Sequence, residues 1–170
     1  PELKLAQLGA MRAGLDGNGA PEAMALRDVM AARRIDPVHA HDLLTAFERD
    51  VTVNRCADWA DLMDYCRYSA MPVGRYVLDV HGESRATWAA SDALCAALQV
   101  INHLQDCAKD YRTIDRVYIP LDTGVEVTQL AADRATPELR AIITGLAART
   151  VELLDRSAGF SAMIRDRRLA

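Results

Sequence analysis

Residues 87–111 have the sequence TWAASDALCAALQVINHLQDCAKDY, which contains neither glycine nor proline. A run of this length and composition predicts one long α-helix. At about 100° per residue, four polar side chains fall within roughly 80° of arc on one face of that helix. They are Gln99, Asn102, Asp106 and Asp110, and apolar residues flank them at Leu94, Leu98, Ile101 and Leu104. A polar stripe on a largely apolar helix indicates a binding site.

The two carboxylates of the stripe favour a bound divalent cation. Asp106 and Asp110 lie four residues apart and repel each other on a solvated helix, whereas a bridging cation reverses that effect. Mg²⁺ prefers carboxylate and phosphate oxygens and keeps several of its waters. A solvated helix face with incidental carboxylates is the alternative, and the D-x-x-x-D spacing alone does not exclude it. His103 and Cys107 are also four residues apart, but no further Cys or His cluster supports a zinc site.

A second group of residues lies in the segment 64–75, DYCRYSAMPVGR. On a helix, Tyr65, Ser69 and Val73 share one face. The small residues Ser69, Ala70 and Gly74 would leave room beside that face for a long hydrocarbon. Close helix–helix packing through the same small residues is the alternative.

The rest of the chain also has helical patterns. We expect helices over residues 2–13, 21–34, 37–50, 59–80, 125–131 and 138–167, with an extended stretch over 116–121. Asp58 and Thr136 are the expected N-caps. Pro72 should bend the helix that contains it, and Gly145 and Gly159 are expected weak points of the last one. These patterns predict one all-α domain over residues 1–170.

Composition limits the function further. The hydrophobic fraction is 51%, the aromatic fraction is 5% and the net charge is −4. No block of like charge suggests a nucleic-acid partner, and the basic cluster at Arg165, Arg167 and Arg168 is interpreted as a solvated helix end. The four cysteines form no C-x-x-C pair, which favours a reducing cytoplasm. No signal peptide is visible. Because the chain opens abruptly at Pro1 in helical sequence and closes abruptly at Ala170, we expect the full-length protein to have further helices at each end.

Three motifs in order resemble those of the squalene/phytoene synthase family. The first is tyrosine–cysteine followed by valine–glycine, at residues 65–66 and 73–74. The second is the stripe of Gln99, Asn102 and D-x-x-x-D, and the third is RVYIP at residues 116–120. The resemblance covers the chain from about Leu43 onward.

Within this family the chain is most similar to the bacterial hydroxysqualene synthases of hopanoid biosynthesis. Those enzymes favour Y-C-R-x-S-A-x-P-V-G-R, present at residues 65–75, and L-Q-D, present at residues 104–106. Gln105 replaces an arginine that many other members carry, which argues against phytoene synthase and ordinary squalene synthase. Asp115 stands where members have glycine, and Cys56 where many have tyrosine. The family's first aspartate-rich motif, which lies further upstream, is absent from residues 1–170.

The resemblance implies an isoprenoid-synthase-type helical bundle around a central cavity, which binds a prenyl diphosphate and no nucleic acid. The enzyme would convert presqualene diphosphate to hydroxysqualene, with Mg²⁺ held by Asp106 and Asp110. Tyr65 would act in catalysis together with these carboxylates. Substrate contacts would come from Ser69, Val73, Gly74, Val77, Gln99, Asn102 and Gln105. A cytoplasmic location fits this function, and peripheral contact with the inner face of the membrane stays open.

Two other functions remain open. The first is condensation of farnesyl diphosphate, by a presqualene diphosphate synthase or a phytoene synthase. The second belongs to another class of protein, a non-catalytic relative that keeps the fold as an assembly or binding module. The intact Asp106 and Asp110 pair weighs against the non-catalytic relative.

Overall fold

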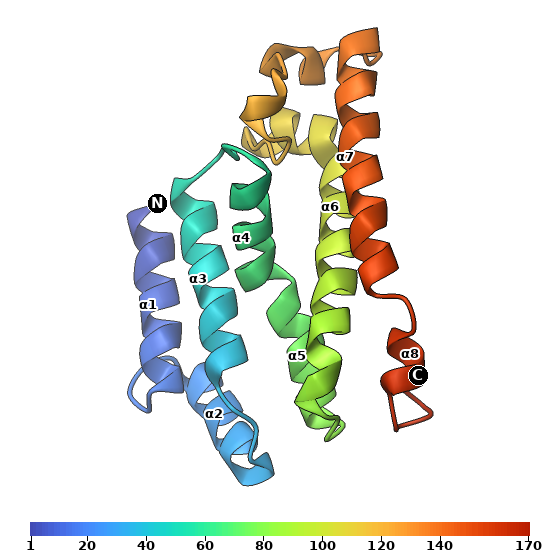
Figure 1. Cartoon of the computed structure of the whole chain (residues 1–170). Coiled ribbons are helices and arrows are strands. Elements are labelled where there is room, and N and C mark those ends of the chain that lie inside the picture. Colours follow the sequence, from blue (N-terminus) through green and yellow to red (C-terminus); the bar gives the residue numbers. More distant parts are fainter.

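The computed structural model describes residues 1–170 and consists of helices joined by turns and loops (Figure 1). Its α-helices are α1 (Glu2–Leu15), α2 (Pro21–Arg33), α3 (Val38–Thr52), α4 (Trp59–Ser69), α5 (Met71–Val80), α6 (Trp88–Ile114), α7 (Pro137–Arg156) and α8 (Phe160–Met163). Three short 3₁₀ helices join them: η1 (Arg85–Thr87), η2 (Leu121–Thr123) and η3 (Val127–Ala131). One isolated β-bridge connects Arg55 to Val117. No helix combines the length and apolarity that crossing a membrane requires.

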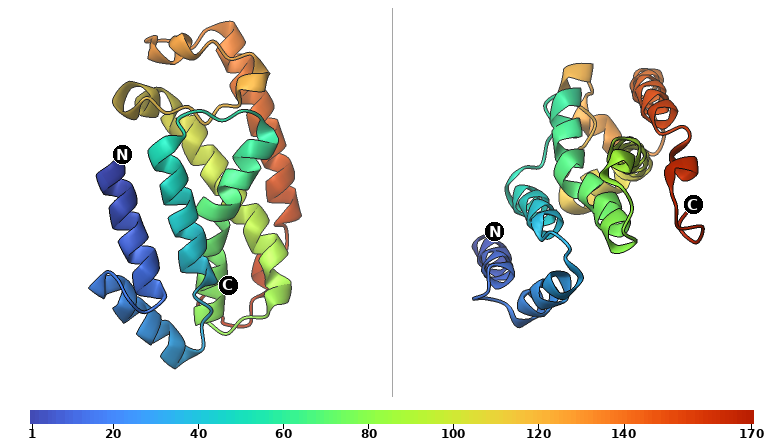
Figure 2. Two further views of the ribbon diagram at one scale, coloured as in Figure 1. Left: turned by 90° about the vertical axis from the view of Figure 1, so that its left-hand side faces the viewer. Right: turned by 60° about the horizontal axis from the view of Figure 1, so that its bottom comes forward.

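The helices form a bundle in which α6 is the central element. Helix α6 packs against α4, α5 and α7, whereas α1 packs against α2 and α3. Figure 2 shows in its right-hand view that α4 and α5 lie between α3 and α6. Side chains from α3, α4 and α6 can therefore meet at one place.

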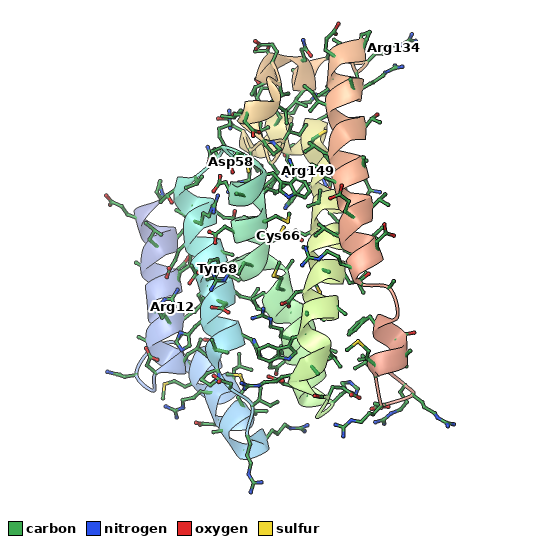
Figure 3. All side chains as sticks on the ribbon, in the orientation of Figure 1. Arg12, Asp58, Cys66, Tyr68, Arg134 and Arg149 are labelled. Atoms are coloured by element: carbon green, nitrogen blue, oxygen red, sulfur yellow. The ribbon has the colours of Figure 1, made fainter.

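Apolar residues hold this arrangement in three clusters. The cluster between α4, α6 and α7 contains Cys56, Leu62, Cys66, Ala96, Ala97, Val100 and Leu153. Figure 3 shows Cys66 facing the space between α4 and α6. A second cluster joins the segment after α6 to α7 through Val117, Ile119, Val125, Leu130, Leu139 and Leu146. The third joins α1, α2 and α3 through Leu15, Ala23, Met30, Ile35 and Leu44. Alanines on α6 let its neighbours approach closely, which anchors the helix that carries the polar stripe.

The expected N-caps are confirmed. The Asp58 carboxylate accepts the backbone N–H of Asp61 at 2.8 Å, and the Thr136 hydroxyl accepts that of Leu139 at 3.2 Å. Each cap satisfies a backbone N–H that has no partner inside the first turn of its helix.

Three expected elements differ from the observed ones. The segment 59–80 is two helices, because Ala70 leaves helical geometry (φ −122°, ψ −48°) and Pro72 lies in the first turn of α5. Proline has no N–H to donate, so it is tolerated where a helix begins. The last long helix ends at Arg156, and Gly159 adopts a left-handed φ of 80° before α8. The segment near residue 130 is a 3₁₀ turn.

Gly74 is the point of closest approach between α5 and α6. A Cβ atom built there would lie 2.5 Å from the Ser91 Oγ atom and 2.6 Å from the Cys95 Sγ atom. The absence of a side chain at this residue allows close helix packing, which was the alternative interpretation, and a substrate contact at Gly74 stays a prediction.

We expect Gly74→Ala to lower the free energy of unfolding of the full-length protein by up to about 2 kcal/mol. Overpacking costs about 1–3 kcal/mol, and the better helix propensity of alanine offsets about 1 kcal/mol of it. Urea denaturation measures the difference. Gly145→Ala on α7 is the matched control, because a Cβ there meets no atom within 4 Å. It should stabilise by up to about 1 kcal/mol, and equal effects of the two substitutions would contradict the packing role of Gly74.

Candidate active site

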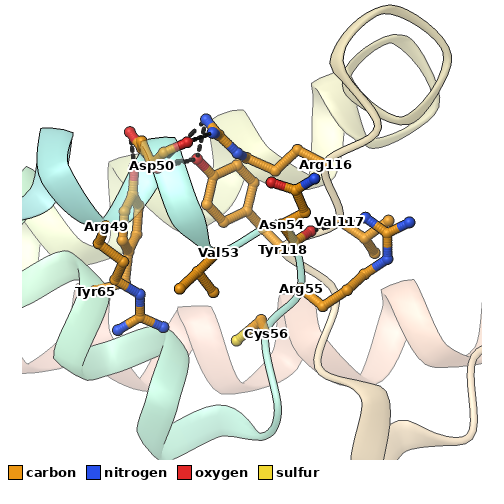
Figure 4. Close-up of a pocket in the computed structure, with 10 residues that line it drawn as sticks. All are labelled: Arg49, Asp50, Val53, Asn54, Arg55, Cys56, Tyr65, Arg116, Val117 and Tyr118. Atoms are coloured by element: carbon orange, nitrogen blue, oxygen red, sulfur yellow. Dashed lines mark hydrogen bonds and ion pairs between the residues drawn. The ribbon is translucent and has the colours of Figure 1, made fainter. Parts of the chain in front are cut away.

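Tyr65 lies at the centre of a buried polar cluster made by three separate segments. Its side chain is 6% exposed, and its hydroxyl donates to the Asp50 Oδ2 atom at 3.1 Å. The hydroxyl oxygen of Tyr118, which follows α6, lies 3.0 Å from that of Tyr65. The guanidinium of Arg116 pairs with the Asp50 carboxylate at 3.3 Å and also donates to the Asp50 backbone carbonyl (Figure 4). We call Asp50, Tyr65, Arg116 and Tyr118 the tyrosine–arginine cluster.

The two phenols of this cluster remain protonated. Burial is the main cause that raises the pKa of Tyr65 and of Tyr118 above the ordinary value for a phenol. For Tyr65, the hydrogen bond with Tyr118 and the negative charge of Asp50 raise the pKa further. Both hydroxyls are therefore hydrogen-bond donors at neutral pH.

His103 connects the polar stripe of α6 to the tyrosine–arginine cluster. Its ring stacks on that of Tyr118, with centroids 3.5 Å apart and an interplanar angle of 18°. The ring centroid of Tyr65 lies 5.8 Å away. The Gln99 Nε2 atom lies 3.1 Å from the His103 Nε2 atom. Burial, and then the positive charge of Arg116, lower the pKa of His103 to about 4, so its ring is neutral at physiological pH.

Asp106 and Asp110 lie further along α6 on the same stripe. The Asp106 side chain is 50% exposed, and one of its oxygens lies 3.7 Å from the Lys109 Nζ atom. Desolvation and the neighbouring Asp106 charge raise the pKa of Asp110. Repulsion between two neighbouring oxygen ligands fits a divalent cation. No cluster of three or more His, Cys, Asp or Glu residues completes a metal site in the chain. Residues 1–170 therefore offer two carboxylate ligands, and a cation would need others.

The remaining predicted substrate contacts lie on α4, α5 and α6. The Ser69 hydroxyl is buried and has no hydrogen-bond partner. Val73 and Val77 are 49% and 37% exposed, which is unusual for valines and leaves apolar surface on α5. Asn102 is exposed on the stripe, whereas Gln105 borders an apolar groove between α6 and α7. Gln105 therefore faces α7, whereas Gln99 contacts His103.

Comparison with known proteins places the chain in a family. The model of the squalene/phytoene synthase family matches residues 1–170. The chain belongs to the squalene/phytoene synthase family. The resemblance inferred from the three motifs is thus confirmed.

Similar proteins of this family include two bacterial enzymes. The chain is 52% identical to the hydroxysqualene synthase of Rhodopseudomonas palustris, covering 99% of the chain and 60% of that protein. It is 53% identical to the hydroxysqualene synthase of Zymomonas mobilis, covering 98% of the chain and 59% of that protein. The chain thus spans about three fifths of the length of these relatives.

Solved structures confirm the predicted isoprenoid-synthase fold. The squalene synthase HpnC of Alicyclobacillus acidocaldarius superposes with a TM-score of 0.80 at 32% identity, covering 94% of the chain and 63% of that structure. A dehydrosqualene synthase in complex with ligand gives 0.77 at 25% identity, covering 95% and 58%.

One departure from the family motifs has a structural explanation. Asp115, which replaces a glycine, ends α6 with a left-handed φ of 51°. Glycine adopts this conformation most readily, but aspartate is one of the residues that tolerate it. The Arg55 guanidinium donates to the Asp115 Oδ1 atom at 2.5 Å and to the Asp115 backbone carbonyl, and these bonds hold Asp115 in place.

Sequence patterns missed two members of the site. His103 was considered only as a zinc ligand, although its spacing of four residues from Gln99 indicates a contact on the same helix face. Asp50 carries no local signal, because its hydrogen-bond partners Tyr65 and Tyr118 lie 15 and 68 residues away in the sequence. Arg116 and Tyr118 were recognised as parts of a motif, without a position relative to Tyr65.

Proposed function

We propose that the full-length protein is a hydroxysqualene synthase, which converts presqualene diphosphate to hydroxysqualene. One observation carries the proposal for this chain. The carboxylates of Asp106 and Asp110 share a helix face with Gln99. Gln99 contacts His103, whose ring stacks on Tyr118 of the tyrosine–arginine cluster. Relatives about half identical to the chain carry the name hydroxysqualene synthase. Two carboxylates on α6 for a metal, and the tyrosine–arginine cluster beside that helix, suit the release of an anionic leaving group.

The first step is loss of diphosphate. A magnesium ion, when bound, supplies positive charge that neutralises the leaving diphosphate. Asp106 and Asp110 would hold this ion, and we propose that helices outside residues 1–170 complete the same domain and provide its other ligands. The Arg116 guanidinium adds a fixed positive charge, and its Nε atom is buried without a partner. The hydroxyls of Tyr65 and Tyr118 stay protonated, and their hydrogen bonds to Asp50 position the pair that Asp50 makes with Arg116. Such preorganised charges and donors stabilise charge that develops in the transition state.

The second step is capture of the cation by water. The cyclopropylcarbinyl cation that forms must be shielded until it rearranges, and apolar surface provides that shielding. Val73, Val77 and Leu98 have exposed apolar side chains that can supply it. Ser69, Asn102 and Gln105 would contact the substrate beside them. In this function the protein works in the cytoplasm, in peripheral contact with the inner face of the membrane that delivers its lipid substrate.

The full-length protein should form hydroxysqualene from presqualene diphosphate and magnesium without any nicotinamide cofactor. Product analysis after incubation with and without NADPH tests this, and heavy-oxygen water should label the alcohol. A chelator should abolish the reaction. Squalene formed only with NADPH would indicate a reductive squalene synthase instead. Consumption of farnesyl diphosphate but not of presqualene diphosphate would indicate the condensing reaction, and a folded protein that consumes neither would indicate a non-catalytic relative.

A further inference from the structure

The contact between Gln99 and His103 gives the two side chains one orientation, in which the Gln99 amide nitrogen faces the ring. It joins the Gln99 amide nitrogen to the His103 Nε2 atom at 3.1 Å. An amide nitrogen can only donate, and a neutral imidazole has one donor nitrogen and one acceptor nitrogen. With the amide in this orientation, the His103 Nε2 atom is the acceptor and the ring proton is on Nδ1. The Gln99 carbonyl oxygen then lies on the side of the amide that faces away from the ring.

Resting on the proposed function, we infer that His103 is a positioning residue, which turns the Gln99 carbonyl oxygen toward the site to hold the water that captures the cation. The chemistry of the stripe supports this assignment. Diphosphate oxygens accept hydrogen bonds and would be repelled by a carbonyl oxygen, whereas water donates to it. A reversed amide would present its NH₂ group and would bind diphosphate instead of water.

The surroundings of His103 keep its ring in place. Tyr118 covers one face of the ring at 3.5 Å, and Tyr65 lies beside it at 5.8 Å. The charged groups that act on the ring are Arg116, which opposes protonation, and Asp106, which favours it. Burial adds to the effect of Arg116, so the ring stays neutral. A protonated ring would donate from both nitrogens and would turn the Gln99 amide round.

Gln99 takes up no proton in the reaction. The bond between carbon and the diphosphate oxygen breaks, and diphosphate leaves with the electron pair. The water oxygen forms a bond to the rearranged cation. The proton that this water loses goes to a diphosphate oxygen, so the products are hydroxysqualene and hydrogen diphosphate. Gln99 accepts a hydrogen bond from the water and sets the direction in which the water attacks. This direction determines the fraction of cations that are captured as hydroxysqualene.

The tautomer of His103 can be measured without any turnover. In full-length protein labelled with ¹⁵N-histidine, nuclear magnetic resonance distinguishes a protonated Nδ1 atom from a protonated Nε2 atom. The spectrum of His103→Phe identifies the signal by its disappearance. We expect the Nδ1–H form at neutral pH. A proton on Nε2 would place the Gln99 carbonyl against the ring and would overturn the inference.

Product partitioning tests the effect on the reaction. In His103→Phe the ring can still stack on Tyr118 but cannot accept from Gln99, and Gln99→Leu removes the amide. Each should lower the ratio of hydroxysqualene formed to diphosphate released by about fivefold to tenfold. This ratio does not depend on the overall rate. The double variant should lose no more than either single variant, because both act through one contact. Cys107→Ala, one turn further along α6, should leave the ratio unchanged.

The outcomes separate this inference from the proposed function. Unchanged ratios in both single variants, or losses that multiply in the double variant, would overturn the role of His103 while hydroxysqualene synthesis by the unaltered protein stands. If the unaltered protein releases no diphosphate from presqualene diphosphate, the proposed function fails. The tautomer measurement then still decides the orientation of Gln99, even if a variant does not fold.

Discussion

Replacing Asp106 or Asp110 by asparagine is expected to lower turnover of presqualene diphosphate by the full-length protein at least about 10²-fold. Each substitution removes one of the two carboxylates that this chain offers to the metal, and no nearby acidic cluster replaces it. The fold should persist, because Asp106 is half exposed and the raised pKa of Asp110 reflects desolvation and repulsion rather than a stabilising contact. Steady-state kinetics at saturating magnesium and thermal unfolding measure the two effects.

Asp155→Asn is the matched control for these variants. Asp155 is an exposed carboxylate on α7, so its substitution changes the net charge by the same amount away from the stripe. Turnover should then stay within about twofold, because exposed charges at a distance are screened by salt. Near-normal turnover in both Asp106→Asn and Asp110→Asn would contradict the assignment of the metal site.

The stripe on α6 could be predicted because it depends on one helix. Helical periodicity alone places Gln99, Asp106 and Asp110 on a common face, whatever packs around them. The N-cap at Asp58 could be predicted for the same reason, since the cap bonds to a backbone N–H three residues away. Features that are local in the sequence need no knowledge of the tertiary fold.

Features that depend on distant contacts could not be predicted. The small residue Gly74 is compatible with a channel or with close packing, and its close approach to Ser91 on α6 is seen only in the structure. Gly159 is an expected weak point, but the end of the last long helix at Arg156 could not be predicted. The chain beyond it is held by Glu83, whose carboxylate accepts the backbone N–H groups of Arg165 and Asp166 at 3.0 and 2.8 Å. The tyrosine–arginine cluster likewise joins three segments that no sequence period relates.

That cluster gives the second large expected effect, in Asp50→Ala. The substitution leaves the Arg116 charge unpaired and removes an acceptor from the hydroxyls of Tyr65 and Tyr118. Loss of one partner from a fully buried ion pair costs about 3–5 kcal/mol. Because the side chains of Arg116 and Asp50 are 17% and 25% exposed, we expect a smaller loss of about 2–3 kcal/mol in the free energy of unfolding.

Asp50→Ala should also lower turnover on the order of 10²-fold, because it releases the groups that position Tyr65. Tyr65→Phe keeps the ion pair between Asp50 and Arg116, so it should lose activity while retaining most of the stability.

The matched control is Glu48→Ala, two residues earlier on α3, where the carboxylate pairs with Arg12 at 3.0 Å near the surface. An exposed pair of this kind contributes at most about 1 kcal/mol, and it lies outside the cluster. Urea denaturation and steady-state kinetics of the three variants test the prediction. If Asp50→Ala resembles Glu48→Ala in both measurements, the ion pair with Arg116 does not organise the site.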